Sequence, residues 1–258
     1  MMNAKSKSIR VMVVGESWVK HTVHLKGFDQ FHSTEFEEGA TRFLNILKET
    51  GLDVTYIRAH EVSSHFPSSI EELKKFDVIV ISDIGSNSFL LTDATFLKSK
   101  RAPNLLRLVS EFVQGGGGLV MVGGYLSFTG IDGRARYGMS PLAEVLPVSL
   151  LDHDDRIEVP EGLNATVVDG THPSLGQATS DWPILLGYNR FRAKAGSTTL
   201  VEHGDDPILV VGQFGRGRTV AFASDLAPHW APREFLEWSH YPSLWSSIVN
   251  WAGSAESL

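Results

Sequence analysis

The chain has 258 residues, of which 42% are hydrophobic and 21% are charged. This composition is typical of a globular protein with a sizeable core, and the length suits one large domain. The formal net charge of −7 argues against broad binding to a phosphate backbone, so we expect no nucleic-acid partner. The sequence contains no cysteine, which excludes disulfides, thiolate metal sites and a cysteine nucleophile.

The beginning of the chain is polar and basic and is not followed by the apolar stretch of a signal peptide. No apolar run approaches the ~18 residues that a transmembrane helix needs. We therefore expect a cytoplasmic protein with no membrane partner.

The first half of the chain alternates short apolar strands with helices. Strands are predicted at residues 8–15, 52–58, 77–82 and 119–122, and helices at residues 34–47, 70–76 and 103–114. No clear regular structure is predicted for residues 19–33 and 86–102. The alternation predicts an α/β fold with a flavodoxin-like, doubly wound, mostly parallel sheet whose core spans residues 1–147.

The second half is rich in β-forming and turn residues. Strands are predicted at residues 156–159, 166–168, 184–188, 198–201, 208–214 and 218–223, between a short helix within residues 137–147 and a closing helix at 242–252. We interpret residues 148–258 as an antiparallel C-terminal extension of the same sheet. Residues 1–258 then form a single domain.

Polar and aromatic residues follow the predicted strands, where ligands bind in open α/β sheets. We expect the loops at residues 16–18, 83–87, 123–128 and 225–230 to form one crevice for a small polar ligand. The candidate ligand-binding residues are Glu16, Trp18, Asp83, Gly85, Gly123, Gly124, Tyr125, Phe128, Arg134, Arg136 and Trp230.

Several of these residues have a structural alternative. Gly123 and Gly124 could let backbone amides approach a ligand, or serve only the packing of a tight turn. Arg134 and Arg136 could clamp a carboxylate or phosphate, or pair with the acidic run at residues 152–155.

Candidate catalytic residues are Tyr125, Ser127, Asp225 and His229. Aspartate and histidine can perform acid–base chemistry, although the loop that holds them could equally be an aromatic corner packed beneath the closing helix. The sequence fixes no base beside Ser127, and the G-x-S-x-G signature of serine hydrolases is missing.

His21 and His24 have the H-x-x-H spacing of a weak metal-site candidate, for which surface exposure or capping is the simpler explanation. We assign no metal to the chain, and the sequence identifies no cofactor.

The segments KGFDQF, SDIGSN, GGGLVMVGGYLSFTGIDG, DDRIEVPEG, THPSL and SDLAPHW resemble the class I glutamine amidotransferase-like superfamily, within it the proteins related to the ThuA group. The superfamily's working enzymes place a cysteine in a small-x-Cys-x-small turn. That resemblance puts Tyr125 in the nucleophile slot, and a phenol with a pKa near 10 replaces a thiolate poorly. Asp225 and His229 are the nearest triad partners, with a different order and spacing.

Thioester-based glutamine amidotransfer is therefore excluded. Three functions stay open: a protein that binds a small polar ligand, a non-catalytic oligomeric binding or assembly protein, and a ThuA-like enzyme of carbohydrate metabolism. We expect a symmetric homo-oligomer.

Overall fold

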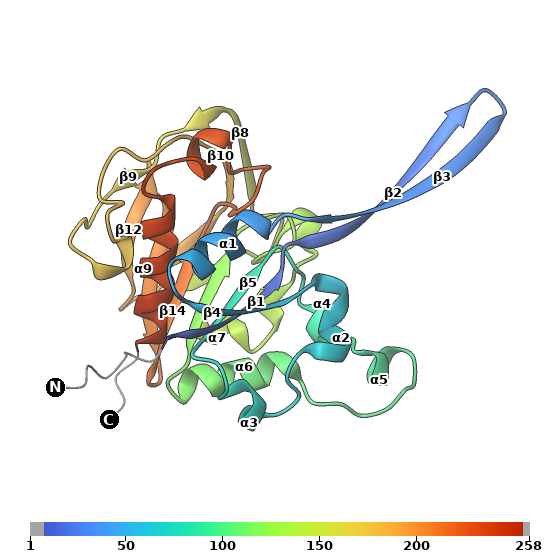
Figure 1. Ribbon diagram of the computed structural model, residues 1–258, viewed down its shortest axis with the longest axis horizontal. Coiled ribbons are helices and arrows are strands. Elements are labelled where there is room, and N and C mark those ends of the chain that lie inside the picture. The colour runs from blue at the N-terminus through green and yellow to red at the C-terminus, as the bar shows by residue number, and fades with distance from the viewer. Residues whose placement is uncertain (1–7, 255–258) are drawn as a thin grey trace.

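The computed structural model describes residues 8–254 and contains one large sheet with helices on both faces (Figure 1). Residues 1–7 lie outside the described residues. They include the start of the polar segment in which the sequence predicts no signal peptide. Helices α1 (Thr41–Glu49) and α9 (Tyr241–Gly253) pack against each other on one face, and α6 (Leu105–Gln114) covers the other. The α/β class is confirmed.

Five parallel strands form the centre of the sheet, in the order β4-β1-β5-β6-β14. They are β1 (Arg10–Gly15), β4 (Asp53–Ile57), β5 (Val78–Ser82), β6 (Gly118–Val122) and β14 (Gly217–Phe222). Strands β5 and β6 are entirely buried, which explains why they are continuous apolar runs. This is the flavodoxin-like order, and it reverses between β1 and β5.

Three antiparallel strands extend the sheet beyond β14: β13 (Asp206–Phe214), β12 (Thr198–His203) and β9 (Thr166–Val167). The other strands of the second half form separate two-stranded ribbons instead of continuing the edge. Strand β8 (Arg156–Leu163) pairs with β10 (Leu185–Asn189), and β7 (Val148–Leu150) pairs with β11 (Phe191–Ala193).

The remaining helices are short. They are α2 (Val62–His65), α3 (Ile70–Leu73), α4 (Asn87–Leu90), α5 (Asp93–Phe96), α7 (Leu142–Val145) and α8 (Arg233–Leu236). Helix α6 begins two residues after Pro103, because the Asn104 side chain accepts a hydrogen bond from the Arg107 amide (3.1 Å) and caps it. Within residues 8–254, no helix is long and apolar enough to cross a membrane.

The prediction for residues 19–47 was wrong in its first part. Strands β2 (Ser17–Lys26) and β3 (Asp29–Glu38) form a ten-rung hairpin that projects from the body of the molecule (Figure 1), and α1 begins only at Thr41. Glutamates at residues 35, 37 and 38 are common in the first turn of a helix, but they are equally compatible with a strand that is exposed to solvent. The pairing of Phe36 with Val19 decides for the strand.

Candidate functional site

Two acidic residues follow the pair of strands at which the sheet order reverses. Glu16 comes directly after β1 and Asp83 directly after β5. The Glu16 amide donates to the Ser82 carbonyl (2.8 Å), and the Ser82 hydroxyl donates to the Glu16 carboxyl group (2.5 Å). The side chain of Glu16 is thereby fixed inside the protein, where it is 1% exposed.

A third carboxyl group joins them from the end of β14. Asp225 is buried and accepts a hydrogen bond from the Ala227 amide (2.9 Å). Its carboxyl group interacts electrostatically with both Glu16 and Asp83. Three strand ends therefore bring three acidic side chains together, which we call the carboxyl cluster.

Burial makes the charged form of each member of the carboxyl cluster unfavourable. It raises the pKa of Glu16 to about 8, and the neighbouring Asp83 adds to the rise. Burial also raises the pKa of Asp83 and, with the help of the other two carboxyl groups, raises the pKa of Asp225 well above its usual range. The cluster therefore retains protons at neutral pH.

The backbone at this cluster is strained. Glu16 and Asp83 have φ values of 49° and 40°, and His229 has a φ of 152°, all in a region that non-glycine residues rarely adopt. Each such residue costs about 1–3 kcal/mol, and strain of this kind concentrates at functional sites.

His229 connects the carboxyl cluster to solvent. Its Nδ1 lies 4.0 Å from a carboxyl oxygen of Asp225, while 39% of its side chain is exposed. Burial lowers the pKa of His229 against the opposing effect of Glu158 and Asp83, so the imidazole is neutral at pH 7. His229 also lines a pocket of about 360 Å³ together with Arg42.

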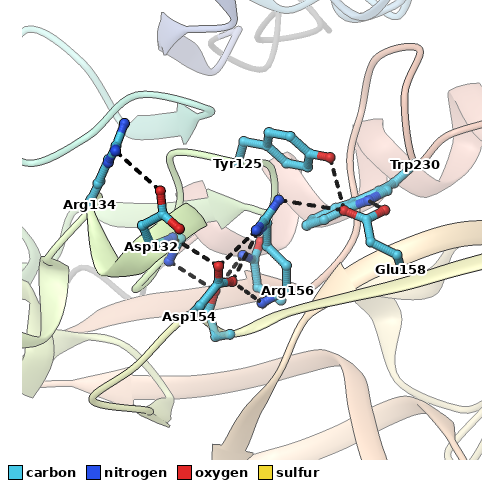
Figure 2. A network of polar contacts seen from close by, with 10 residues as sticks. Tyr125, Asp132, Arg134, Asp154, Arg156, Glu158 and Trp230 are labelled. Atoms are coloured by element: carbon cyan, nitrogen blue, oxygen red, sulfur yellow. Dashed lines mark hydrogen bonds and ion pairs between the residues drawn. The ribbon is translucent and has the colours of Figure 1, made fainter.

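Tyr125 lies beside His229 within a second polar network (Figure 2). Its hydroxyl donates to Glu158 (3.0 Å), which also accepts from the indole of Trp230 (2.9 Å). The guanidinium of Arg156 lies over the Tyr125 ring, 4.7 Å from its centroid, and pairs with Asp154 at 2.8 Å. Burial and the Glu158 carboxylate raise the pKa of Tyr125, so its phenol stays neutral.

The glycine turn after β6 is held by the protein itself. The Gly123 amide donates to the carbonyls of Phe222 and Ser224, and the Gly124 amide donates to the side chain of Asn189 (2.9 Å). Both amides already have acceptors, so packing accounts for the two glycines.

Ser127 and Phe128 are also buried. The Ser127 hydroxyl donates to the Val122 carbonyl (2.5 Å) and accepts from the Asp83 amide (3.1 Å), which leaves it no free role as a nucleophile. Phe128 packs against Phe191. Ser127 and Phe128 therefore support the turn by hydrogen bonding and packing.

Three predicted ligand contacts lie in other pockets. Trp18 donates to Glu37 (3.0 Å) and lines a pocket of about 840 Å³ at the base of the hairpin. Arg134 pairs with Asp132 at 3.2 Å, and with Arg136 it lines a separate pocket of about 730 Å³. Gly85 lies against the backbone of residues 134–135.

His21 and His24 lie on β2, where residues three apart point to opposite faces. Their ring nitrogens contact Thr34 (3.0 Å) and Ser33 (3.1 Å) respectively. Among residues 8–254, no group of three or more histidine and acidic side chains is arranged to hold a metal ion.

Comparison with known proteins identifies the family. The family model described as "Putative glutamine amidotransferase" matches residues 10–254. The chain belongs to this family. The resemblance inferred from the sequence motifs is thereby confirmed.

Solved structures agree with this assignment. Two cytoplasmic proteins of Salmonella typhimurium are similar along nearly their whole length. The first is 47% identical with a TM-score of 0.92, covering 94% of this chain and 98% of the other. The second is 46% identical with a TM-score of 0.91, covering 95% and 99%.

A ThuA-like protein of Parabacteroides merdae shares the fold at 11% identity, with a TM-score of 0.58 over 98% of this chain and 93% of the other. No curated protein matches the sequence.

The turn of this glutamine amidotransferase-like chain differs from a nucleophile elbow. An elbow strains the nucleophile itself and leads into a helix. Here the unusual φ (143°) belongs to Gly124, Tyr125 lies outside the positive-φ region, and a 3₁₀ turn at Ile131–Gly133 follows. Tyr125, which the sequence resemblance puts in the nucleophile slot, therefore has neither a thiol nor the backbone geometry of an elbow.

Sequence reasoning missed the residues that support this turn. Asp155, 1% exposed, accepts from the amides of Thr129 and Gly130 and from the side chain of Asn189, all at 2.8–2.9 Å. Asn189 in turn holds Gly124. Asp155 belongs to the acidic run at residues 152–155, for which the sequence offers pairing with Arg134 and Arg136 as one interpretation. In the structure Asp155 instead accepts from backbone amides.

Proposed function

We propose that this glutamine amidotransferase-like protein binds a small, neutral, hydroxyl-rich molecule at the face formed by Tyr125, His229 and Glu158, without thioester chemistry. The observation that carries the proposal is the convergence of Glu16, Asp83 and Asp225 behind His229. Glu16 and Asp225 are buried, and Glu16 and Asp83 have strained backbone, which is costly; perturbed groups of this kind cluster at functional sites.

The charges around the face favour a neutral ligand. Glu158 would repel an anion, and the nearby cation Arg156 is already paired with Asp154. The available groups are a neutral imidazole, a phenol, a carboxylate and aromatic ring surface. Hydroxyl groups can donate to and accept from such a set, while the rings pack against the C–H face of a sugar or polyol.

A ThuA-like enzyme of carbohydrate metabolism is the second candidate. Its support is the pairing of a neutral His229 with protonated carboxyl groups, since groups whose pKa values are pushed apart can act as base and acid. In that role His229 would accept a proton from a bound hydroxyl. A protonated carboxyl group of the carboxyl cluster would supply the acid.

We also propose a cytoplasmic location. Its support is that the two Salmonella typhimurium relatives are described as cytoplasmic proteins.

A thermal-shift screen with sugars, polyols and small carboxylates tests the binding proposal. A ligand present at 100 times its Kd stabilises the fold by ~2.7 kcal/mol, so a saturable rise in Tm is expected with a hydroxylated compound. His229→Ala and Glu158→Gln should abolish the rise, whereas Arg134→Ala, in a separate pocket, should keep it.

A shift that survives in the His229 and Glu158 variants would refute the site. A shift produced only by anionic compounds would refute the ligand class. Product formation from a bound sugar that His229→Ala abolishes would favour the enzyme over the binding protein.

A further inference from the structure

The β2–β3 hairpin begins at Ser17, directly after Glu16 of the carboxyl cluster, and projects from the body into solvent (Figure 1). Its strands have ten residues each, and at ~3.4 Å per residue the arm spans about 30 Å. Among residues 8–254, the contacts that anchor the arm to the body lie at its base, where Phe36 contacts His60 and Arg58 pairs with Glu38. An isolated two-stranded hairpin is marginally stable in water, so a covering partner is expected for the rest.

The two faces of the arm differ sharply in chemistry. Residues paired across the strands share a face, and alternate residues along a strand share it too. One face, which we call the neutral face, carries Val19, His21, Val23, Leu25, Gln30, His32, Thr34 and Phe36. The other, the charged face, carries the lysines and the acidic residues Lys20, Lys26, Asp29, Glu35 and Glu37.

Four of the eight side chains on the neutral face, Val19, Val23, Leu25 and Phe36, are apolar and exposed. Leu25 is 72% exposed and Val23 is 52% exposed, and Phe28 at the tip is fully exposed. Val23 and Leu25 follow one another on this face toward the tip that carries Phe28, and exposed apolar side chains gathered in this way on a projecting ribbon mark an interaction surface.

We propose that the neutral face binds the neutral face of a second copy of this chain, so that the arms form the core of a symmetric oligomer. The charge distribution selects this occupant. Each molecule carries a net charge of −7, which disfavours contact between two copies through most of their surface. Between Val19 and Phe36 the neutral face contains no lysine, arginine, aspartate or glutamate, and Glu38, which follows on the same face at the base, is paired with Arg58. Two identical faces therefore meet without opposing like charges.

A twofold contact suits such a face because each apolar side chain then lies against the same patch of the partner. The charged face remains in solvent, where Lys20 and Glu37 pair with each other. The contact would bury the apolar side chains that the isolated hairpin exposes, which explains how a long arm stays folded.

Sedimentation of the full chain tests the proposal. The wild-type protein should be a dimer or a higher even-numbered oligomer. The double variant Val23→Glu/Leu25→Glu should be monomeric. The matched variant Thr22→Glu/His24→Glu, which places the same charges on the opposite face at adjacent positions, should keep the wild-type mass. A monomeric wild type, or equal masses for the two variants, overturns the proposal.

Cross-linking gives a second test that does not depend on disrupting the arm. Because the chain has no cysteine, Val23→Cys and Thr22→Cys each introduce a single thiol. Two packed sheets lie about 10 Å apart, within reach of a short bismaleimide. Val23→Cys should give covalent dimers and Thr22→Cys should not. The opposite pattern, or no dimer from either variant at a concentration where the wild type is oligomeric, refutes contact through the neutral face.

Discussion

The ring of Tyr125 stands perpendicular to the imidazole of His229, with the two centroids 4.3 Å apart. Tyr125 follows β6 and His229 follows β14, which are neighbouring parallel strands. The fold therefore places His229, a candidate base, beside the residue that the sequence resemblance puts in the nucleophile slot. The pair is present, although neither the phenol nor its backbone suits nucleophilic attack.

Replacing Tyr125 with cysteine tests this relationship directly. The variant has a single thiol, and the neutral imidazole of His229 can accept its proton and then stabilise the thiolate as an imidazolium. We expect Tyr125→Cys to react with iodoacetamide at pH 7 severalfold faster than the double variant Tyr125→Cys/His229→Ala. The rates are measured by mass spectrometry, and a cysteine at the exposed Glu111 supplies the reference rate.

The same variant should not hydrolyse glutamine. The residue at position 125 lacks the strained backbone of an elbow, and the glycine amides beside it already have protein acceptors. Ammonia release from glutamine at a rate that depends on the new thiol would contradict this reasoning.

Strand and helix positions in the parallel core followed well from the sequence because buried strands such as β5 and β6 are short, continuous apolar runs. The hairpin at residues 17–38 could not be found in this way. Its residues are solvent-exposed on both faces, so the usual contrast between buried and exposed positions is weak.

The candidate site was predictable only in part. Glu16, Asp83 and Asp225 all follow strands that end at the same edge of the sheet, which predicts that they lie near one another, and their carboxyl groups interact in the structure. The hydrogen-bond partners of Gly123, Gly124 and Ser127 come from distant parts of the chain, and no local sequence pattern encodes them. Their residue types suggest a role in ligand binding or catalysis, whereas in the structure they support the turn.

The carboxyl cluster should make stability depend on pH. The folded protein keeps a proton on Glu16 up to about pH 8, whereas the unfolded chain releases it near the ordinary value of 4.5. The native state therefore binds more protons between these values, and the free energy of unfolding falls as pH rises from 4.5 to 8. Asp83 and Asp225, whose pKa values are also raised, contribute with the same sign.

Glu16→Gln should flatten this profile, because the amide stays neutral at every pH. One pKa unit corresponds to ~1.4 kcal/mol, so we expect the variant to melt several degrees above wild type at pH 9. Scanning calorimetry between pH 5 and pH 9 measures the effect. The exposed Glu111→Gln is the control and should follow the wild-type curve. A Glu16→Gln profile as steep as that of the wild type would show that the Glu16 carboxyl is not the titrating group.

Asp155 should be essential for stability rather than for chemistry. Its replacement by alanine leaves three buried donors unsatisfied: the amides of Thr129 and Gly130 and the side chain of Asn189. Each costs about 1–3 kcal/mol, so we expect a loss of at least ~3 kcal/mol in urea unfolding. Asp152→Ala removes a carboxylate that is 99% exposed and should change stability by less than about 0.5 kcal/mol. Equal unfolding midpoints for the two variants would refute the assignment.

Substituting alanine for Gly124 has two costs: strain in the backbone, and a clash with Asp83. A second glycine allows the two costs to be measured separately. Gly124 and Gly196 both have positive φ values, 143° and 84°, so alanine strains the backbone at either position. A Cβ at Gly196 meets open space, whereas a Cβ at Gly124 lies 2.8 Å from the Asp83 carboxyl oxygen.

Gly196→Ala should therefore cost only the ~1–2 kcal/mol of the left-handed backbone, and Gly124→Ala should cost clearly more. Gly124→Ala should also displace the Asp83 side chain, which accepts from the Leu126 amide (2.6 Å), and weaken any ligand response of the site. Urea unfolding of the two variants, together with the thermal-shift response of each, measures both effects. If the two substitutions cost the same and both keep the ligand response, the turn does not hold Asp83 in place.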